Sequence, residues 1–235
     1  MIVNIVECFA GVRRAKGLVV VIDVFRSSTV ACFLAAGDRG GDYIATNSLD
    51  QARKFAKEYG GKVLGELEGV GAEAFDYNNS PFQLDQLDLA GQALVHVTNA
   101  GTWGMMHCSE ADEVIVGCFV NAAAVVNYIR RQAPETVTLV AMGTNGDMRA
   151  QEDMMCAMFI KNELENYPNS IKTLKTFLAG VDSAGKFFDE SRTDCPQEDF
   201  DLCMDLNRFD FVLKAEPLPG GVRLKKITVS ASETA

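Results

Sequence analysis

An acid, an arginine and several hydroxyls follow a short apolar segment near the start of the chain. The segment GLVVVI ends at Asp23, and Arg26, Ser27 and Ser28 come directly afterwards. A carboxylate at a strand end, beside a hydroxyl-rich helix N-terminus, suits Mg²⁺ and phosphate, because the helix dipole and the backbone N–H groups favour an anion. Arg26 can add two parallel donors to a phosphate or sulfonate. The alternative is a buried strand and a capped helix, with Asp23 or Ser27 serving only as the cap.

Three later stretches repeat the order of apolar strand, polar turn and helix. Their turns contain Thr98 and Asn99, then Asn121, then Thr144 and Asn145. Near-continuous apolar strands that alternate with helices predict an α/β fold, with a mostly parallel or mixed sheet covered by helices. Ligands of such sheets bind beyond the carboxyl ends of the strands. We therefore expect these side chains to lie along one edge of the sheet with Asp23.

Further acids occupy positions that suit a metal. Glu66 ends the strand predicted from Lys62, and Glu152 and Asp153 lie in the first turns of a predicted helix. Acids in the first turn of a helix interact favourably with the helix dipole, and this alone can account for their presence. The following MMCAMFI is so apolar, however, that one of the pair should face inward or into a cleft, where a buried carboxylate requires a partner such as a metal or an arginine.

Other segments have plainer interpretations. Ser48 and the pattern after it predict a capped helix from Leu49 to Tyr59, and the segment 219–221, Pro-Gly-Gly, predicts a hairpin turn. His96 lies within the strand pattern ALVHV, which favours a structural role. The segment 180–186 is similar to a phosphate-binding loop, but Phe187 replaces the required hydroxyl. We interpret the acidic run 189–210 as a solvated helix face and a turn.

Composition limits the classes of function. The net charge of −10 argues against nucleic-acid binding, and no apolar run is long enough to span a membrane. Seven cysteines without a CxxC pair indicate neither a disulfide framework nor a zinc site. We expect a cytoplasmic protein with one domain over residues 1–235. A division in the middle of the chain and a homodimer are both left open.

Five stretches together resemble a known family, the magnesium-dependent 2-phosphosulfolactate phosphatases. In chain order they are VVIDVFRSST, GELEGVGAEAFDYNNSP, VTNAGT, VGCFVNAAAV and GTNGDMRAQEDMMCA. The resemblance implies an α/β fold peculiar to that family and Mg²⁺ as cofactor. It also implies a small anionic phosphoester substrate, with hydrolysis of 2-phospho-3-sulfolactate to 3-sulfolactate and phosphate. That reaction is a step toward coenzyme M in methanogens.

These observations together define a candidate site. We expect the metal ligands to be Asp23, Glu66, Glu152 and Asp153, and the catalytic residues to be Asp23, Arg26, Ser27 and Ser28. Substrate binding is expected from Asn79, Ser80, Thr98, Asn99, Asn121 and Asn145. Phe25 stands where the haloacid dehalogenase-like phosphatases have a second Asp, which favours attack by a metal-activated water. Whether Asp23 is a ligand or a nucleophile stays open.

Three departures from the family pattern bear on the substrate. Leu67 stands where the family usually has Arg, and its loss removes a bidentate anion donor. Asn78 replaces a usual Gly, and Ala100 interrupts the usual Thr-Thr-Asn-Gly-Thr. Two alternatives follow: a phosphatase of the same fold that acts on another small phosphorylated acid, and a non-catalytic anion-binding protein.

Overall fold

The computed structural model describes residues 1–36 and 41–229 of the chain. Within these residues, ten strands form a single sheet in the order β1-β8-β2-β7-β9-β10-β3-β6-β4-β5. The strands are β1 (Ile2–Glu7), β2 (Lys16–Ile22), β3 (Tyr43–Thr46), β4 (Lys62–Gly65), β5 (Tyr77–Asn78), β6 (Leu94–Val97), β7 (Glu110–Gly117), β8 (Thr136–Ala141), β9 (Phe211–Leu218) and β10 (Gly221–Thr228).

Helices cover this sheet and separate its strands in the sequence. The α-helices are α1 (Cys8–Val12), α2 (Ser27–Ala36), α3 (Leu49–Tyr59), α4 (Pro81–Asp85), α5 (Ala100–His107), α6 (Ala122–Gln132), α7 (Gln151–Glu165), α8 (Ile171–Leu178) and α9 (Gln197–Cys203). Short 3₁₀ segments are η1 (Ala72–Ala74), η2 (Phe119–Asn121) and η3 (Asp182–Phe187). The expected α/β fold with a mixed, helix-covered sheet is confirmed. No helix of the described residues has the length and apolar character needed to cross a membrane.

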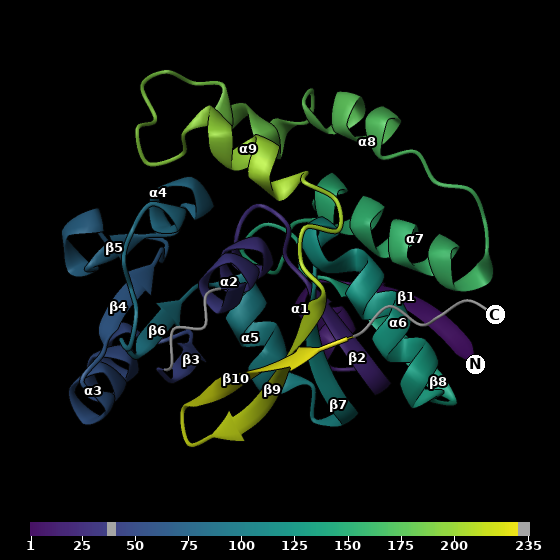
Figure 1. Ribbon diagram of the computed structural model, residues 1–235, viewed down its shortest axis with the longest axis horizontal. Coiled ribbons are helices and arrows are strands. Elements are labelled where there is room, and N and C mark those ends of the chain that lie inside the picture. Colours follow the sequence, from purple (N-terminus) through teal and green to yellow (C-terminus); the bar gives the residue numbers. More distant parts are fainter. Residues whose placement is uncertain (37–40, 230–235) are drawn as a thin grey trace.

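The sheet consists of two parallel blocks that a hairpin joins. Strands β1, β8, β2 and β7 are parallel to one another, as are β3, β6, β4 and β5. The hairpin β9–β10 pairs antiparallel with β7 on one side and with β3 on the other, and it lies between the two blocks in Figure 1. The hairpin predicted at residues 219–221 is thereby confirmed.

This order makes the two blocks run in opposite directions along the sheet. In a flat sheet the carboxyl ends of β2 and β4 would then lie at opposite edges. Neighbouring strands twist by about 20–25°, so the six steps from β2 to β4 rotate the strand direction by about 120–150°. This rotation offsets most of the reversal. The carboxyl ends of both blocks consequently converge, and contacts between residues that follow β2, β4 and β6 show this directly.

Local sequence explains the central elements. Leu18 to Ile22 of β2 are buried, as expected for a strand covered on both faces. The first eight residues of α2 are also buried, so this helix is apolar around its circumference and packs against α4 and α5. Ser48 caps α3 by accepting a hydrogen bond from the Gln51 N–H, and Gly60 ends that helix at φ 65°. The bounds predicted for α3 are confirmed.

Candidate active site

A cleft of about 580 Å³ lies where the two blocks converge. Segments after β2, β4, β6 and β8 line it, together with the N-terminus of α7 and the segment from η3 onward. Among the residues predicted from the sequence, those that line the cleft are Asp23, Ser27, Glu66, Thr98, Asn99, Asn145, Glu152 and Asp153. The structure therefore brings together the four acids proposed as metal ligands.

Asp23 is held between the N-termini of two helices. Its Oδ2 accepts a hydrogen bond from the Gly101 N–H of α5 at 2.9 Å, and its Oδ1 accepts one from the Ser27 N–H of α2 at 3.4 Å. Burial, followed by the negative charge of Glu66, raises the pKa of Asp23 to about 6. A Cβ at position 101 would lie 2.7 Å from the Ser27 Oγ and 2.9 Å from the Asp23 Oδ2, so only glycine allows this approach.

Asp153 joins the ends of two neighbouring strands. Its Oδ1 accepts a hydrogen bond from the Val24 N–H at 2.7 Å, and its Oδ2 accepts one from the Gly143 N–H at 2.8 Å. Burial raises the pKa of Asp153 well above its usual range, and the nearby Asp23 and Glu152 raise it further. An ionised Asp153 therefore lacks sufficient compensation from the described protein groups, which is the situation that a bound cation relieves.

Glu152 and the hydroxyls complete the inner wall. The Glu152 Oε2 accepts a hydrogen bond from the Ser183 hydroxyl at 2.6 Å, and burial raises the pKa of Glu152. The Oγ of Ser27 lies 3.1 Å from the Oγ1 of Thr98. Both acids at the start of α7 thus reach the cleft, whereas the apolar helix sequence predicted this for only one of the pair.

Glu66 forms an ion pair with an arginine of the same chain. Its Oε2 accepts a hydrogen bond from the Arg26 Nη2 at 2.8 Å, and its Oε1 accepts one from the Asn79 Nδ2 at 3.0 Å. Burial acts to raise the pKa of Glu66, but the charges of Arg26 and Lys186 outweigh it, so this pKa is lowered. Glu66 is consequently ionised at neutral pH and available to a cation on its cleft side.

Arg26 occupies a different place from the one expected. The side chain is fully buried and does not line the cleft. Its Nη1 donates to the Asp199 Oδ2 at 2.7 Å and to the Asp194 carbonyl at 2.8 Å, in addition to the Nη2 contact with Glu66. Both terminal nitrogens of Arg26 are therefore engaged with the protein, and its buried Nε has no hydrogen-bond partner among the described residues. Arg26 holds Glu66 in position and ties the segment around α9 to the sheet.

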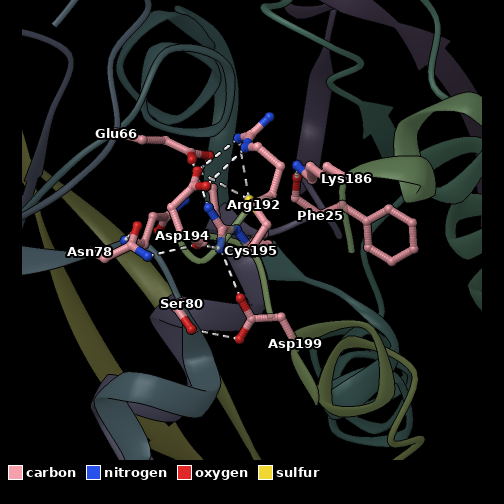
Figure 2. Close-up of polar contacts among 12 residues, drawn as sticks. Phe25, Glu66, Asn78, Ser80, Lys186, Arg192, Asp194, Cys195 and Asp199 are labelled. Carbon is pink, nitrogen blue, oxygen red and sulfur yellow. Dashed lines mark hydrogen bonds and ion pairs between the residues drawn. The ribbon is translucent and has the colours of Figure 1, made fainter. Parts of the chain in front are cut away.

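Four other predicted residues also lie outside the cleft lining. The Ser28 Oγ accepts a hydrogen bond from the Asp23 N–H, and Asn79 bridges Glu66 and His96. Ser80 caps α4 and donates to Asp199 at 2.7 Å, which Figure 2 shows. Asn121 donates to the carbonyls of Val116 and Phe211 in the core. These contacts orient the backbone and other side chains, and none of the four side chains faces the cleft.

His96 is structural, as its strand pattern indicated. Both ring nitrogens form hydrogen bonds. The Nδ1 lies 2.9 Å from the Tyr43 hydroxyl, and the Nε2 lies 2.9 Å from the Asn79 Oδ1. Burial lowers the pKa of His96 to about 4, so the ring is neutral at pH 7. A chain of polar contacts therefore runs from the core of the second block through Asn79 to Glu66.

Sequence reasoning missed several residues that line the cleft. They are Glu68, Asp182, Ser183, Lys186 and Arg192. Lys186 lies in the segment rejected as a phosphate-binding loop, and Arg192 lies in the run interpreted as solvated. That interpretation is wrong for Asp199, which is buried against Arg26. The one sequence signal for Lys186 and Arg192 was that both are basic residues in a mostly acidic part of the chain.

The lining is strongly acidic. Six acids and two bases face the cleft: Asp23, Glu66, Glu68, Glu152, Asp153 and Asp182 against Lys186 and Arg192. Among residues 1–36 and 41–229, no three His, Cys, Asp or Glu side chains are grouped to hold a metal ion unaided. Mg²⁺ does not need such a cage, because it commonly binds one or two carboxylates together with waters and a substrate phosphate. The hard oxygen donors present fit that mode of binding.

The sequence comparisons agree with this geometry. The family model described as 2-phosphosulpholactate phosphatase matches residues 8–217. A "Probable 2-phosphosulfolactate phosphatase" of Clostridium perfringens is 34% identical over 152 residues, which cover 63% of this chain and 60% of that protein. The protein of the same name from Bacillus subtilis is 28% identical over 202 residues, covering 84% and 86% of the two chains.

A third relative, from Thermotoga petrophila, carries the same name and is 31% identical over 148 residues, or 63% of each chain. The chain thus spans less than two thirds of the Clostridium and Thermotoga relatives and most of the Bacillus one. The family model covers nearly the whole chain, including every acid that lines the cleft. This chain belongs to the 2-phosphosulpholactate phosphatase family, a family of phosphoric monoester hydrolases.

Proposed function

We propose that the protein is a Mg²⁺-dependent phosphatase that hydrolyses 2-phospho-3-sulfolactate to 3-sulfolactate and phosphate. The observation that supports this most strongly is the single cleft in which Asp23, Glu66, Glu152 and Asp153 meet at the convergent strand ends. Family membership supports the reaction class. The seven free cysteines support a cytoplasmic setting, where thiols stay reduced.

Charge balance supports the requirement for a divalent cation. The proposed substrate carries a phosphate, a sulfonate and a carboxylate, whereas the cleft presents six acids and only two bases. Like charges at close range disfavour binding unless a cation lies between them. Bound Mg²⁺ would neutralise phosphoryl charge and act as a Lewis acid toward the phosphoryl oxygens.

The groups of the chain itself would position the substrate. The hydroxyls of Ser27 and Thr98 and the amides of Asn99 and Asn145 face the cleft, and Asn99 donates to Asn145 at 3.2 Å. Such donors stabilise the equatorial oxygens of a transferring phosphoryl group, a reaction that depends chiefly on positioning and charge. Because Phe25 and not an acid follows Asp23 by two positions, we propose that water, rather than Asp23, attacks the phosphorus.

One observation favours a second candidate substrate. Leu67 lines the cleft and presents an apolar side chain beside Glu66 and Glu68. An apolar wall of this kind suits a small phosphorylated acid with a less polar substituent than a sulfonate. The alternative is therefore a phosphatase of the same fold that acts on such an acid.

A phosphate-release screen over small phosphorylated acids, with Mg²⁺ and with EDTA, tests the proposal. We expect Mg²⁺-dependent turnover with the highest kcat/KM for 2-phospho-3-sulfolactate, and loss of turnover in Asp23→Asn. A higher kcat/KM for an unsulfonated phospho acid would favour the alternative substrate. Absence of phosphate release from every compound, with binding of the same anions retained, would instead indicate an anion-binding protein.

A further inference from the structure

Both bases that line the cleft come from one segment in the last third of the chain. Lys186 lies at the end of η3, and Arg192 lies in the turn between η3 and α9. The residues predicted from the sequence come instead from the strand ends and from the N-termini of α2, α4, α5 and α7. The acids of the cleft and its bases therefore have largely separate origins in the fold. Figure 2 draws both bases together with Glu66.

Lys186 is the base close to the inner acids. Its Nζ donates to the Phe25 carbonyl at 3.0 Å, directly after the strand end that carries Asp23. This uses one of the three donors of the ammonium group. Lys186 also acts to lower the pKa of Asp23, Glu66 and Glu152. An ammonium in this position can donate hydrogen bonds to a phosphoryl oxygen next to the proposed metal ligands.

Arg192 is held in one orientation at the outer part of the cleft. Its Nε and Nη2 donate to the two carboxylate oxygens of Asp194, at 2.8 and 2.7 Å. Its Nη1 makes no hydrogen bond within the described residues, and 47% of its side chain is exposed. Lys186, by contrast, is only partly exposed. The remaining donor of Arg192 can therefore bind a ligand at the more exposed part of the cleft.

The turn that carries Arg192 is fastened to the rest of the site. The Asp194 carbonyl accepts hydrogen bonds from the Arg26 Nη1 at 2.8 Å and from the Asn78 Nδ2 at 2.7 Å. The Thr193 carbonyl accepts one from the Gln83 Nε2 at 3.2 Å. Supporting contacts of this kind hold a binding group in the geometry that recognition requires. The guanidinium is therefore presented by a supported turn.

We propose that Lys186 binds the phosphoryl group and that Arg192 determines specificity by binding the sulfonate at the other end of the substrate. This proposal rests on the proposed phosphatase function and names the residues that recognise its substrate. A lysine serves a phosphate as a compact charge, whereas the guanidinium matches an oxyanion by directed hydrogen bonds. The two sites differ in depth, so they distinguish the two ends of one small molecule.

The test compares two substrates that differ only in the sulfonate: 2-phospho-3-sulfolactate and 2-phospholactate. For Arg192→Gln, we expect KM for the sulfonated substrate to rise about tenfold or more, with kcat nearly unchanged, and KM for 2-phospholactate to stay as in the wild type. Arg192→Lys, which keeps the charge, should recover part of the preference. For Lys186→Gln, we expect kcat/KM to fall about 100-fold on both substrates.

Arg53→Gln is the matched control, because Arg53 is exposed on α3 and does not line the cleft. Melting temperatures of all variants show whether each is folded. An equal loss on both substrates in Arg192→Gln would mean that Arg192 only holds its turn, and would overturn the proposal. Wild-type protein that releases phosphate from neither substrate would refute the proposed function itself, and the specificity proposal with it.

Discussion

Replacing Asp23 by asparagine should stabilise the metal-free protein while it abolishes turnover. The pKa of Asp23 is raised from 3.8 to about 6, chiefly by burial. A group whose pKa is raised by folding contributes stability that is complete below pH 3.8 and is lost as the pH rises through about 6. This shift corresponds to about 3 kcal/mol of lost stability above pH 7. Asparagine carries no charge, so it avoids that loss.

The substitution has one opposing cost. Both Asp23 oxygens accept backbone N–H groups, from Gly101 and Ser27, and the asparagine amide can accept only one of them. The lost hydrogen bond costs about 1 kcal/mol. We therefore expect Asp23→Asn to be more stable than the wild type by about 2 kcal/mol at pH 8, with an advantage smaller by about 1.5 kcal/mol at pH 5.

Urea unfolding in EDTA at pH 5 and pH 8 measures this difference, with the fluorescence of Trp103 as the probe. Trp103 is the single tryptophan and lies on α5, the helix whose N-terminus contacts Asp23. Saturating Mg²⁺ should reverse the ranking, because a ligand at 100 times its Kd stabilises the protein that binds it by about 2.7 kcal/mol. An Asp23→Asn protein that is less stable than the wild type in EDTA, equally at both pH values, would refute this reasoning.

Three further outcomes are expected. Arg26→Met should lower the free energy of unfolding by about 3–5 kcal/mol, because Glu66 and the buried Asp199 both lose their partner. Urea denaturation measures this free energy, and a decrease of less than about 1 kcal/mol would contradict the prediction. Glu152→Gln should raise the Mg²⁺ concentration for half-maximal phosphate release at least about tenfold, and an unchanged requirement would exclude Glu152 as a ligand. Because burial lowers the pKa of His96 to about 4, its NMR signals should remain those of neutral imidazole at pH 5. The stability that neutral His96 contributes should be lost as the pH falls from 6.5 toward 4. An NMR titration of His96 with its midpoint near pH 6.5 would contradict this.

The local elements were predictable from the sequence because short-range rules govern them. The cap at Ser48 and the bounds of α3 follow from backbone hydrogen bonding within a few residues. The hairpin between β9 and β10 follows from Gly220, whose φ of 84° suits glycine. Four of the six carboxylates of the cleft were also predictable, because acids at the ends of apolar strands and beside apolar helix faces must find partners.

The roles of individual polar residues depended on contacts between distant parts of the chain. Arg26 and Asp199 are 173 residues apart, and their pairing turns a predicted phosphate donor into a support for Glu66. No periodicity in the sequence shows which buried charge will meet which partner. Similarly, Asn121 follows a strand as the other site residues do, yet its side chain turns back to core carbonyls.

By itself the sequence determined an α/β chain in which acids at strand ends and at one helix N-terminus form a proposed cation site. Only the tertiary structure decided how those ends meet, because the two parallel blocks run in opposite directions and converge through the accumulated twist of the sheet. It also decided that Lys186 and Arg192 complete the cleft. The physical reason is that hydrogen bonds within a few residues set each element, whereas side-chain burial and charge pairing depend on the packing of the whole molecule.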